Sequence, residues 1–125
     1  IVYFMGMNLS RLDDGELFEC SNGMWGIIME SAYKTGWKPL GTFKIDENDN
    51  PDPNWDKNDY SSHQGQIVNE TDAFEFSKAL KKYIEIEKEI IDPNEYSIIS
   101  KFIEWLNINS QEPNLDDYFP GFEIN

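Results

Sequence analysis

Two amphipathic helix patterns follow one another between residues 69 and 106, and they restrict the fold of this chain more than any other feature. In each pattern apolar side chains recur at spacings of three and four, as a helix with one buried face requires. The first stripe consists of Ala73, Phe76, Leu80 and Ile84, and the second of Ile99, Phe102, Ile103 and Leu106. The spacing therefore predicts two helices that pack their apolar faces into a core.

Both helices have recognisable starts. Asn69 is a good helix cap, and Asp72, three residues on, resembles the acidic member of a capping box. Asp92 precedes a proline at the first helical position and a glutamate at the third, which is a strong signal for a helix start. Ile98 and Trp105 widen the apolar face of the second helix, and this indicates either deep packing or a dimer surface.

Short extended segments are expected on either side of these helices. Residues 1–9 are rich in side chains that favour strands, and residues 40–45 alternate polar with apolar side chains. Residues 66–68 form a short extended piece, and residues 122–124 are suited to close a sheet as a final strand. Directly after the first segment, the polar residues 11–15 end in an Asp-Gly turn signal.

A further helix is expected over residues 24–33. Ser21 or Asn22 serves as its cap, and Gly36 is a natural residue to end it. Together these elements predict an α+β fold with a small, mainly antiparallel sheet and about three helices packed on one face. The length of 125 residues fits a single domain over residues 1–125.

The chain is strongly acidic, with 24 Asp and Glu against 10 Lys and Arg and a net charge of −14. Such a surface repels phosphates and anionic lipids, so binding to nucleic acid or a membrane is not expected. A basic protein partner, or solubility alone, fits the charge better. There is no run of roughly 18 apolar residues and no signal-peptide pattern, which favours the cytoplasm. The chain does not begin with Met, and Met5 and Met7 are both plausible starts.

The sequence contains little that indicates catalysis. Cys20 is the only cysteine and His63 the only histidine. Cys20 has apolar and acidic neighbours, which are expected to raise its pKa and leave it inert. An enzyme would need a cleft that joins Cys20, His63 or a pair of carboxylates. Because nucleophile-elbow, phosphate-loop and Cys/His metal patterns are also missing, we expect neither an enzyme nor a cofactor or metal ion.

Residues 46–60 form the most polar segment and are expected to be a long exposed loop. Positions 46, 48 and 50 repeat like the start of an EF-hand loop, but Pro51 replaces the required Gly and Lys57 the bidentate Glu. An EF-hand is therefore excluded. A loop that docks on a protein would use aromatic anchors and a charged rim. The residues predicted to bind such a partner are Asp46, Asp49, Asp52, Trp55, Asp56, Asp59 and Tyr60.

Several short motifs resemble an uncharacterised family of small bacterial cytosolic proteins. They comprise residues 5–12, the helix around Trp25, residues 36–42, Gly65-Gln66-x-Val68, Asp72-Ala73 and residues 121–124. The chain departs from this pattern at His63-Gln64, where an Asn and an acid are expected, and at Gly121, where two glycines are usual. The resemblance implies a fold more than a function. Some small acidic proteins of this kind look like immunity proteins that neutralise a partner toxin.

Two functional hypotheses follow. The first is an acidic protein-binding module, such as an immunity protein that inhibits a toxin by occupying its basic cleft. The second is a small-ligand-binding or regulatory domain, whose site lies between the sheet and the turn formed by His63, Gly65 and Gln66. The first hypothesis depends on the net charge and on the two aromatic residues of the acidic loop.

Overall fold

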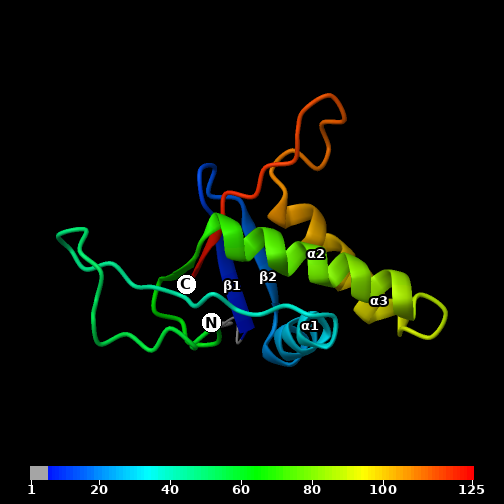
Figure 1. The fold of residues 1–125 in the computed structure, drawn as a ribbon, viewed down its shortest axis with the longest axis horizontal. Coiled ribbons are helices and arrows are strands. Elements are labelled where there is room, and N and C mark those ends of the chain that lie inside the picture. The colour runs from blue at the N-terminus through cyan, green and yellow to red at the C-terminus, as the bar shows by residue number, and fades with distance from the viewer. Residues whose placement is uncertain (1–5) are drawn as a thin grey trace, which may run out of the picture.

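A four-stranded antiparallel sheet organises the fold, which the computed structural model describes over residues 6–125 (Figure 1). Its strands are β1 (Gly6–Arg11), β2 (Leu17–Ser21), β3 (Gln66–Val68) and β4 (Phe122–Ile124). Their order across the sheet is β2-β1-β4-β3. The last strand therefore lies between the first strand and β3, which joins segments from both ends of the described chain.

One face of the sheet is apolar because its register aligns buried side chains in rows. Leu9 lies opposite Phe18 on β2 and Ile124 on β4, and Ile124 in turn lies opposite Gln66 on β3. All four of these side chains are buried. Successive side chains point to opposite faces of a strand, so their neighbours, such as the exposed Glu19, lie on the other face.

Three helices contribute the rest of the core. They are α1 (Asn22–Lys34), α2 (Glu70–Glu87) and α3 (Pro93–Leu106). The predicted caps are confirmed: Ser21, Asn69 and Asp92 each accept a backbone N–H from the first turn of the helix that follows. Gly36 follows α1 with a φ of +102°, a conformation that favours glycine. The predicted α+β class, with an antiparallel sheet and three helices, is confirmed.

Aromatic rings fill the space between the helices and the sheet. The ring of Trp25 on α1 lies 5.9 Å from that of Phe76, 5.6 Å from that of Phe102 and 6.4 Å from that of Phe122. Trp105 is also buried, and its Nε1 donates to the Glu16 carbonyl oxygen. Deep packing therefore explains Trp105 on the wide apolar face of α3, whereas Ile98 is only partly buried.

The N-terminal strands differ from the prediction. The expected strand over residues 1–9 lies partly outside the described residues, and β1 runs from Gly6 to Arg11. The turn after it leads directly into β2, a strand that was not predicted. Within β2, Phe18 and Cys20 point into the core while the alternate positions are exposed.

The predicted strand over residues 40–45 is wrong. Only two isolated bridges form there, between Phe43 and Ile67 and between Ile45 and Pro51. The first bridge covers the outer edge of β3, because Phe43 exchanges both backbone hydrogen bonds with Ile67. After Phe43 the chain leaves the sheet and forms a long loop. The loop is closed at its base, where the N–H of Thr42 donates to the carbonyl oxygen of Lys57.

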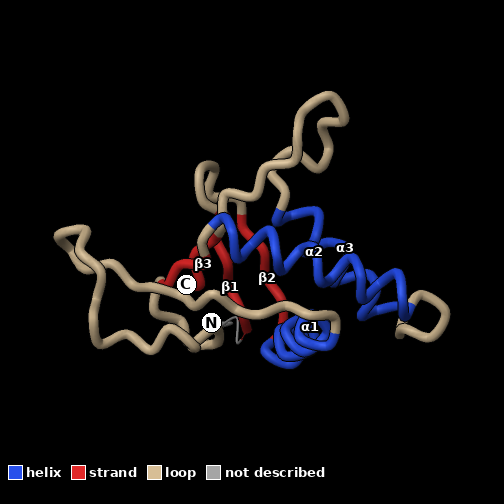
Figure 2. Tube along the Cα trace, viewed as in Figure 1, coloured by secondary structure: helices blue, strands red, loops and turns tan. Residues whose placement is uncertain are grey.

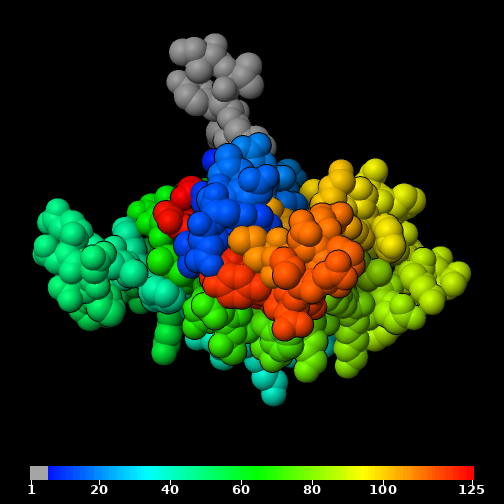
Figure 3. Space-filling model, turned by 90° about the horizontal axis from the view of Figure 1, so that it is seen from above, coloured from blue at the N-terminus to red at the C-terminus, as the bar shows by residue number. Residues whose placement is uncertain are grey.

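Two long loops project from this body, as Figure 2 shows. One connects α1 to β3 and contains the acidic segment, and the other connects α3 to β4. Seen from above, the acidic segment forms a narrow extension at one end of the molecule (Figure 3). None of the helices in residues 6–125 has the length and apolar character that a membrane span requires.

Candidate functional site

The acidic extension, residues 46–59, is here called the acidic arm. Its aspartates accept hydrogen bonds from backbone N–H groups that follow them at short range, as in Asx turns. Asp46 accepts from Asn48 at 2.8 Å and Asn50 at 2.9 Å, Asp52 from Asn54 at 2.9 Å, Asp56 from Asn58 at 2.9 Å, and Asp59 from Ser61 at 3.0 Å and Ser62 at 2.8 Å. The carboxylates thus hold the backbone of the arm in a defined path without a helix or strand.

These turns leave the negative charge at the surface. Asp46, Asp49 and Asp56 are exposed, and Asp52 and Asp59 are partly exposed. Burial favours the protonated form of Asp59, but hydrogen bonds from the Ser62 hydroxyl and from nearby backbone amides outweigh it and lower the pKa of its carboxyl. Asp59 is therefore ionised at neutral pH, and the exposed carboxylates of the arm lie away from the core.

Trp55 lies where the arm meets the body. Its Nε1 donates to the Thr42 Oγ1 at 3.0 Å, and the Lys44 Nζ lies 5.8 Å from the centre of its ring. Thr42 is buried and its hydroxyl donates to the Asp59 carbonyl oxygen. The segments that enter and leave the arm therefore meet at this point. Trp55 itself is only partly buried. It is thus a partly exposed aromatic side chain beside exposed carboxylates, held by one hydrogen bond, and its role as an anchor stays a prediction.

Tyr60, the other predicted anchor, is not available to a partner. It is 2% exposed, and its hydroxyl donates to Asp72 Oδ2 at 2.6 Å while accepting from the Gly41 N–H at 2.9 Å. A tyrosine can be buried in this way when its hydroxyl finds partners in the core. The prediction that Tyr60 binds a partner is therefore wrong, and the residue instead holds the loop against α2.

The Tyr60–Asp72 contact predicts a pH dependence of stability. Burial, followed by the bond to Asp72, raises the pKa of Tyr60 well above its usual value of 10.0. The folded chain keeps this proton at a pH at which the unfolded chain has lost it. The contribution of Tyr60 to the free energy of unfolding is therefore complete below pH 10 and declines as pH rises further. In urea titrations, the stability difference between wild type and Tyr60→Phe should hold up to about pH 10 and shrink as the pH rises further to about 11. A difference that stays constant over this pH range would contradict the assignment.

The predicted ligand turn is occupied by structural contacts. Gln66 is buried, its Nε2 donates to the Ser62 carbonyl oxygen at 2.6 Å, and its Oε1 accepts from the Gln64 N–H at 3.0 Å. Gly65 has a φ of +75° and donates its N–H to the Ile124 carbonyl oxygen. His63 is exposed, with its Nδ1 2.7 Å from a main-chain oxygen of Asn125. Gln66 and Gly65 are therefore explained by the fold, and they are not free to bind a ligand.

Cys20 and His63 do not form a catalytic pair. Cys20 lies on β2 and His63 just before β3, and these strands are the opposite edges of the sheet. Burial raises the pKa of the Cys20 thiol to about 11, so it is protonated at neutral pH. Within residues 6–125, no group of three or more His, Cys, Asp and Glu side chains is arranged to hold a metal ion.

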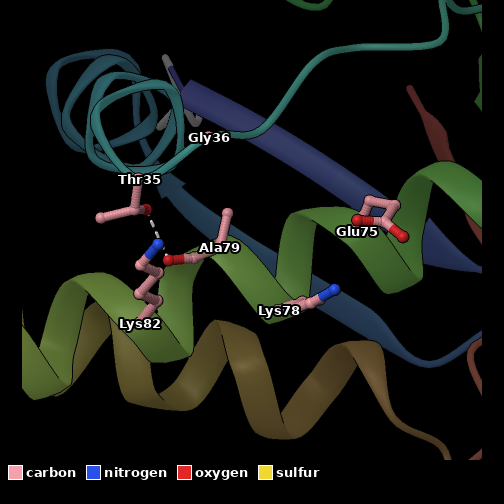
Figure 4. Close-up of a pocket in the computed structure, with 6 residues that line it drawn as sticks. All are labelled: Thr35, Gly36, Glu75, Lys78, Ala79 and Lys82. Atoms are coloured by element: carbon pink, nitrogen blue, oxygen red, sulfur yellow. Dashed lines mark hydrogen bonds between the residues drawn. The ribbon is translucent and has the colours of Figure 1, made fainter.

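A depression of about 340 Å³ lies between the end of α1 and the middle of α2 (Figure 4). Thr35 and Gly36 form one side, and the other side is formed by the backbone and side chains of α2. The Thr35 hydroxyl points across to α2 and is 2.6 Å from the Ala79 carbonyl oxygen, to which it donates. Lys78 and Lys82 border the depression on α2. The Thr35 hydroxyl is thus already engaged, and its hydrogen bond fixes the end of α1 against α2.

The arrangement as a whole contains an ordered acidic arm with one accessible aromatic side chain, and its possible catalytic groups are buried or far apart. The sequence signal for the ordering of the arm is the recurrence of Asp with Asn two positions later, which is typical of Asx turns. When the chain was compared with models of protein families, with curated proteins and with solved structures, none of them matched it.

Proposed function

We propose that this protein is a binding module that engages a basic protein partner through its acidic arm. The observation that carries the proposal is the ordering of exposed carboxylates by Asx turns at one end of the molecule. Residues 46–60 hold six acidic side chains against Lys57 alone. An ordered array of charge loses less conformational entropy on binding than a flexible loop, which favours affinity.

The proposed mechanism combines steering and anchoring. The net charge of −14 draws a basic surface towards the molecule, and the arm concentrates that field at one end. Once contact is made, Trp55 supplies the partly apolar area that slows dissociation. A toxin whose cleft is built for phosphates would suit the carboxylates of the arm, so inhibition of such a toxin, as by an immunity protein, is the specific role we propose.

The first experiment is a pull-down with tagged protein at physiological salt, read by mass spectrometry. One basic protein, captured in stoichiometric amount and released as salt rises, would support the proposal, since exposed charges are screened by salt. Capture of no protein at any salt concentration would contradict it.

A charge variant then tests the arm itself. Asn also forms Asx turns, so Asp46→Asn, Asp52→Asn and Asp56→Asn together remove three charges while keeping the backbone. We expect association with the captured partner to slow about tenfold or more. The matched control replaces exposed acids elsewhere, Glu89→Gln, Glu104→Gln and Glu112→Gln, with the same change in net charge. Equal slowing in both variants would show that net charge, and not the arm, drives association.

A further inference from the structure

A groove separate from the acidic arm runs between α2 and the segment that leads into β4. It consists of two adjoining depressions of about 170 and 270 Å³, which share Phe74, Asp117 and Phe119. The rings of Phe74 and Phe119 meet edge to face, with their centres 5.5 Å apart. Phe74 is 46% exposed because it lies off the buried stripe of α2. The middle of the groove is therefore aromatic.

One end of the groove carries positive charge. Lys78 and Lys81 line it, and neither forms an ion pair within residues 6–125. The Lys81 Nζ lies 5.9 Å from the centre of the Phe119 ring, which holds the ammonium group next to the aromatic surface. Three of the ten basic residues of the chain, Lys78, Lys81 and Lys82, are on α2. The three lysines lie close together, although α2 as a whole carries more acidic than basic side chains.

The same end holds a buried hydroxyl without a partner. Ser77 lines the groove, is 1% exposed, and its Oγ makes no hydrogen bond in the described part of the chain. Buried polar atoms are normally paired, and an unpaired one needs an explanation. Thr35, which lines the neighbouring depression on the other side of Lys78, has its hydroxyl fully engaged. Unlike the Thr35 hydroxyl, the Ser77 hydroxyl therefore keeps its hydrogen-bonding capacity unused.

Negative charge borders the groove as well. Asp117 lines both depressions, and its Oδ1 accepts from the Asn107 Nδ2 at 2.8 Å. Glu70 lines the further depression, in which the Tyr118 hydroxyl is already bonded to Asp13. A ligand in the groove thus meets two ammonium groups, a free hydroxyl, two rings and the Asp117 carboxylate.

From this combination we propose that the groove binds a free α-amino acid with an aromatic side chain. The carboxylate of the ligand accepts from Ser77 and lies near Lys78 and Lys81, while its ammonium group faces Asp117. Its ring packs on Phe74 and Phe119, where aromatic pairs are favourable. The smaller depression offers roughly the space of five or six water molecules, so a ligand of this size extends into the adjoining larger one.

The overall charge and the local charge of the groove together support a zwitterion over a simple ion. A net anion is repelled by the charge of −14 on the chain. A simple cation is repelled locally by the two lysines. A zwitterion avoids both penalties because its charges cancel at a distance and are paired locally. The groove contains no residue of the acidic arm, so this proposal stands or falls independently of the one above.

The test is a titration of isotopically labelled protein, followed by its amide NMR signals. L-phenylalanine should cause saturable shifts at Phe74, Ser77 and Lys81, with a dissociation constant of about 1 mM or below. Two analogues isolate the charges: 3-phenylpropionate lacks the ammonium group and phenethylamine lacks the carboxylate. Each should bind about tenfold more weakly. Absence of saturable shifts with L-phenylalanine, or equal affinity for the three compounds, would overturn the proposal.

Two variants locate the site. Ser77→Ala removes no hydrogen bond of the free protein, so a several-fold loss of affinity would report a bond made only to the ligand. Lys81→Gln should weaken binding about tenfold, whereas Lys82→Gln makes the same change on the same helix but outside the groove and should leave affinity unchanged. Unchanged binding by Ser77→Ala and Lys81→Gln, or an equal loss in Lys82→Gln, would contradict the assignment.

Discussion

Replacing Asp72 by alanine is expected to lower the free energy of unfolding by about 3 kcal/mol or more. This carboxylate is fully buried, yet no salt bridge within residues 6–125 involves it. Hydrogen-bond donors take the place of a cation: Trp37 Nε1 donates to Oδ1 at 2.9 Å, the Leu40 N–H to Oδ1 at 3.3 Å, and the Tyr60 hydroxyl to Oδ2 at 2.6 Å. Alanine leaves the Trp37 and Tyr60 donors buried without an acceptor, and each such group costs about 1–3 kcal/mol.

Urea unfolding, followed by tryptophan fluorescence, measures this loss. Glu75→Ala on the same helix removes a carboxylate for which no hydrogen bond or ion pair is found in the described residues, and it should change stability by about 0.5 kcal/mol or less. Asp72→Asn keeps one carbonyl oxygen and should fall between the two. If Asp72→Ala were as stable as Glu75→Ala, the carboxylate would not be holding the loop against α2.

Asp72 also illustrates where sequence reasoning fails. Three residues after the cap Asn69, it resembles a capping-box residue that bonds back to the cap. The backbone half of that pattern is present, since the Asp72 N–H donates to Asn69 Oδ1 at 2.9 Å. Its side chain instead bonds Trp37 and Tyr60, which are 35 and 12 residues away. A local motif cannot reveal a partner that only the folded chain brings near.

The three helices were predictable because their signals are local. Caps, apolar spacing and the terminal glycine all lie within a few residues of each helix, and each one matches the structure. The sheet was less predictable. β2 has only five residues, and its pairing with β1 depends on a turn whose register the sequence does not specify. The insertion of β4 between β1 and β3 joins segments more than a hundred residues apart, for which no local pattern exists.

In the candidate site, too, the local features were predictable and the long-range contacts were not. The aspartates of the acidic arm belong to short-range turns, so their position on an exposed loop followed from the sequence. Trp55 and Tyr60 looked equivalent there, as aromatic residues in a polar segment. The structure separates them, because the Tyr60 hydroxyl reaches a carboxylate on α2 whereas Trp55 reaches only Thr42 at the base of the arm. Burial of one aromatic residue and partial exposure of the other depend on long-range contacts.

Replacing Gly121 by alanine is expected to destabilise the fold by about 3 kcal/mol or more, through two separate effects. Gly121 has a φ of +89°, which a residue with a Cβ rarely adopts. A Cβ at this position would also lie 2.4 Å from the carbonyl oxygen of Val68 and 3.1 Å from the carbonyl carbon of Asn69. Both obstacles are backbone atoms where β3 leads into α2, and they cannot rotate away as a side chain could. The strand β4 would therefore have to move away from β3.

Gly36→Ala separates the two effects. Gly36 has a φ of +102°, but a Cβ there would meet nothing within 4 Å, so its alanine variant suffers only the conformational cost, about 1–2 kcal/mol. Urea unfolding of both variants should show the larger loss for Gly121→Ala, because the contact with Val68 adds to the same backbone strain. An equal loss in the two variants would mean that β4 shifts without cost. In that case the close approach of Gly121 to Val68 would not be what sets the position of β4 in the sheet.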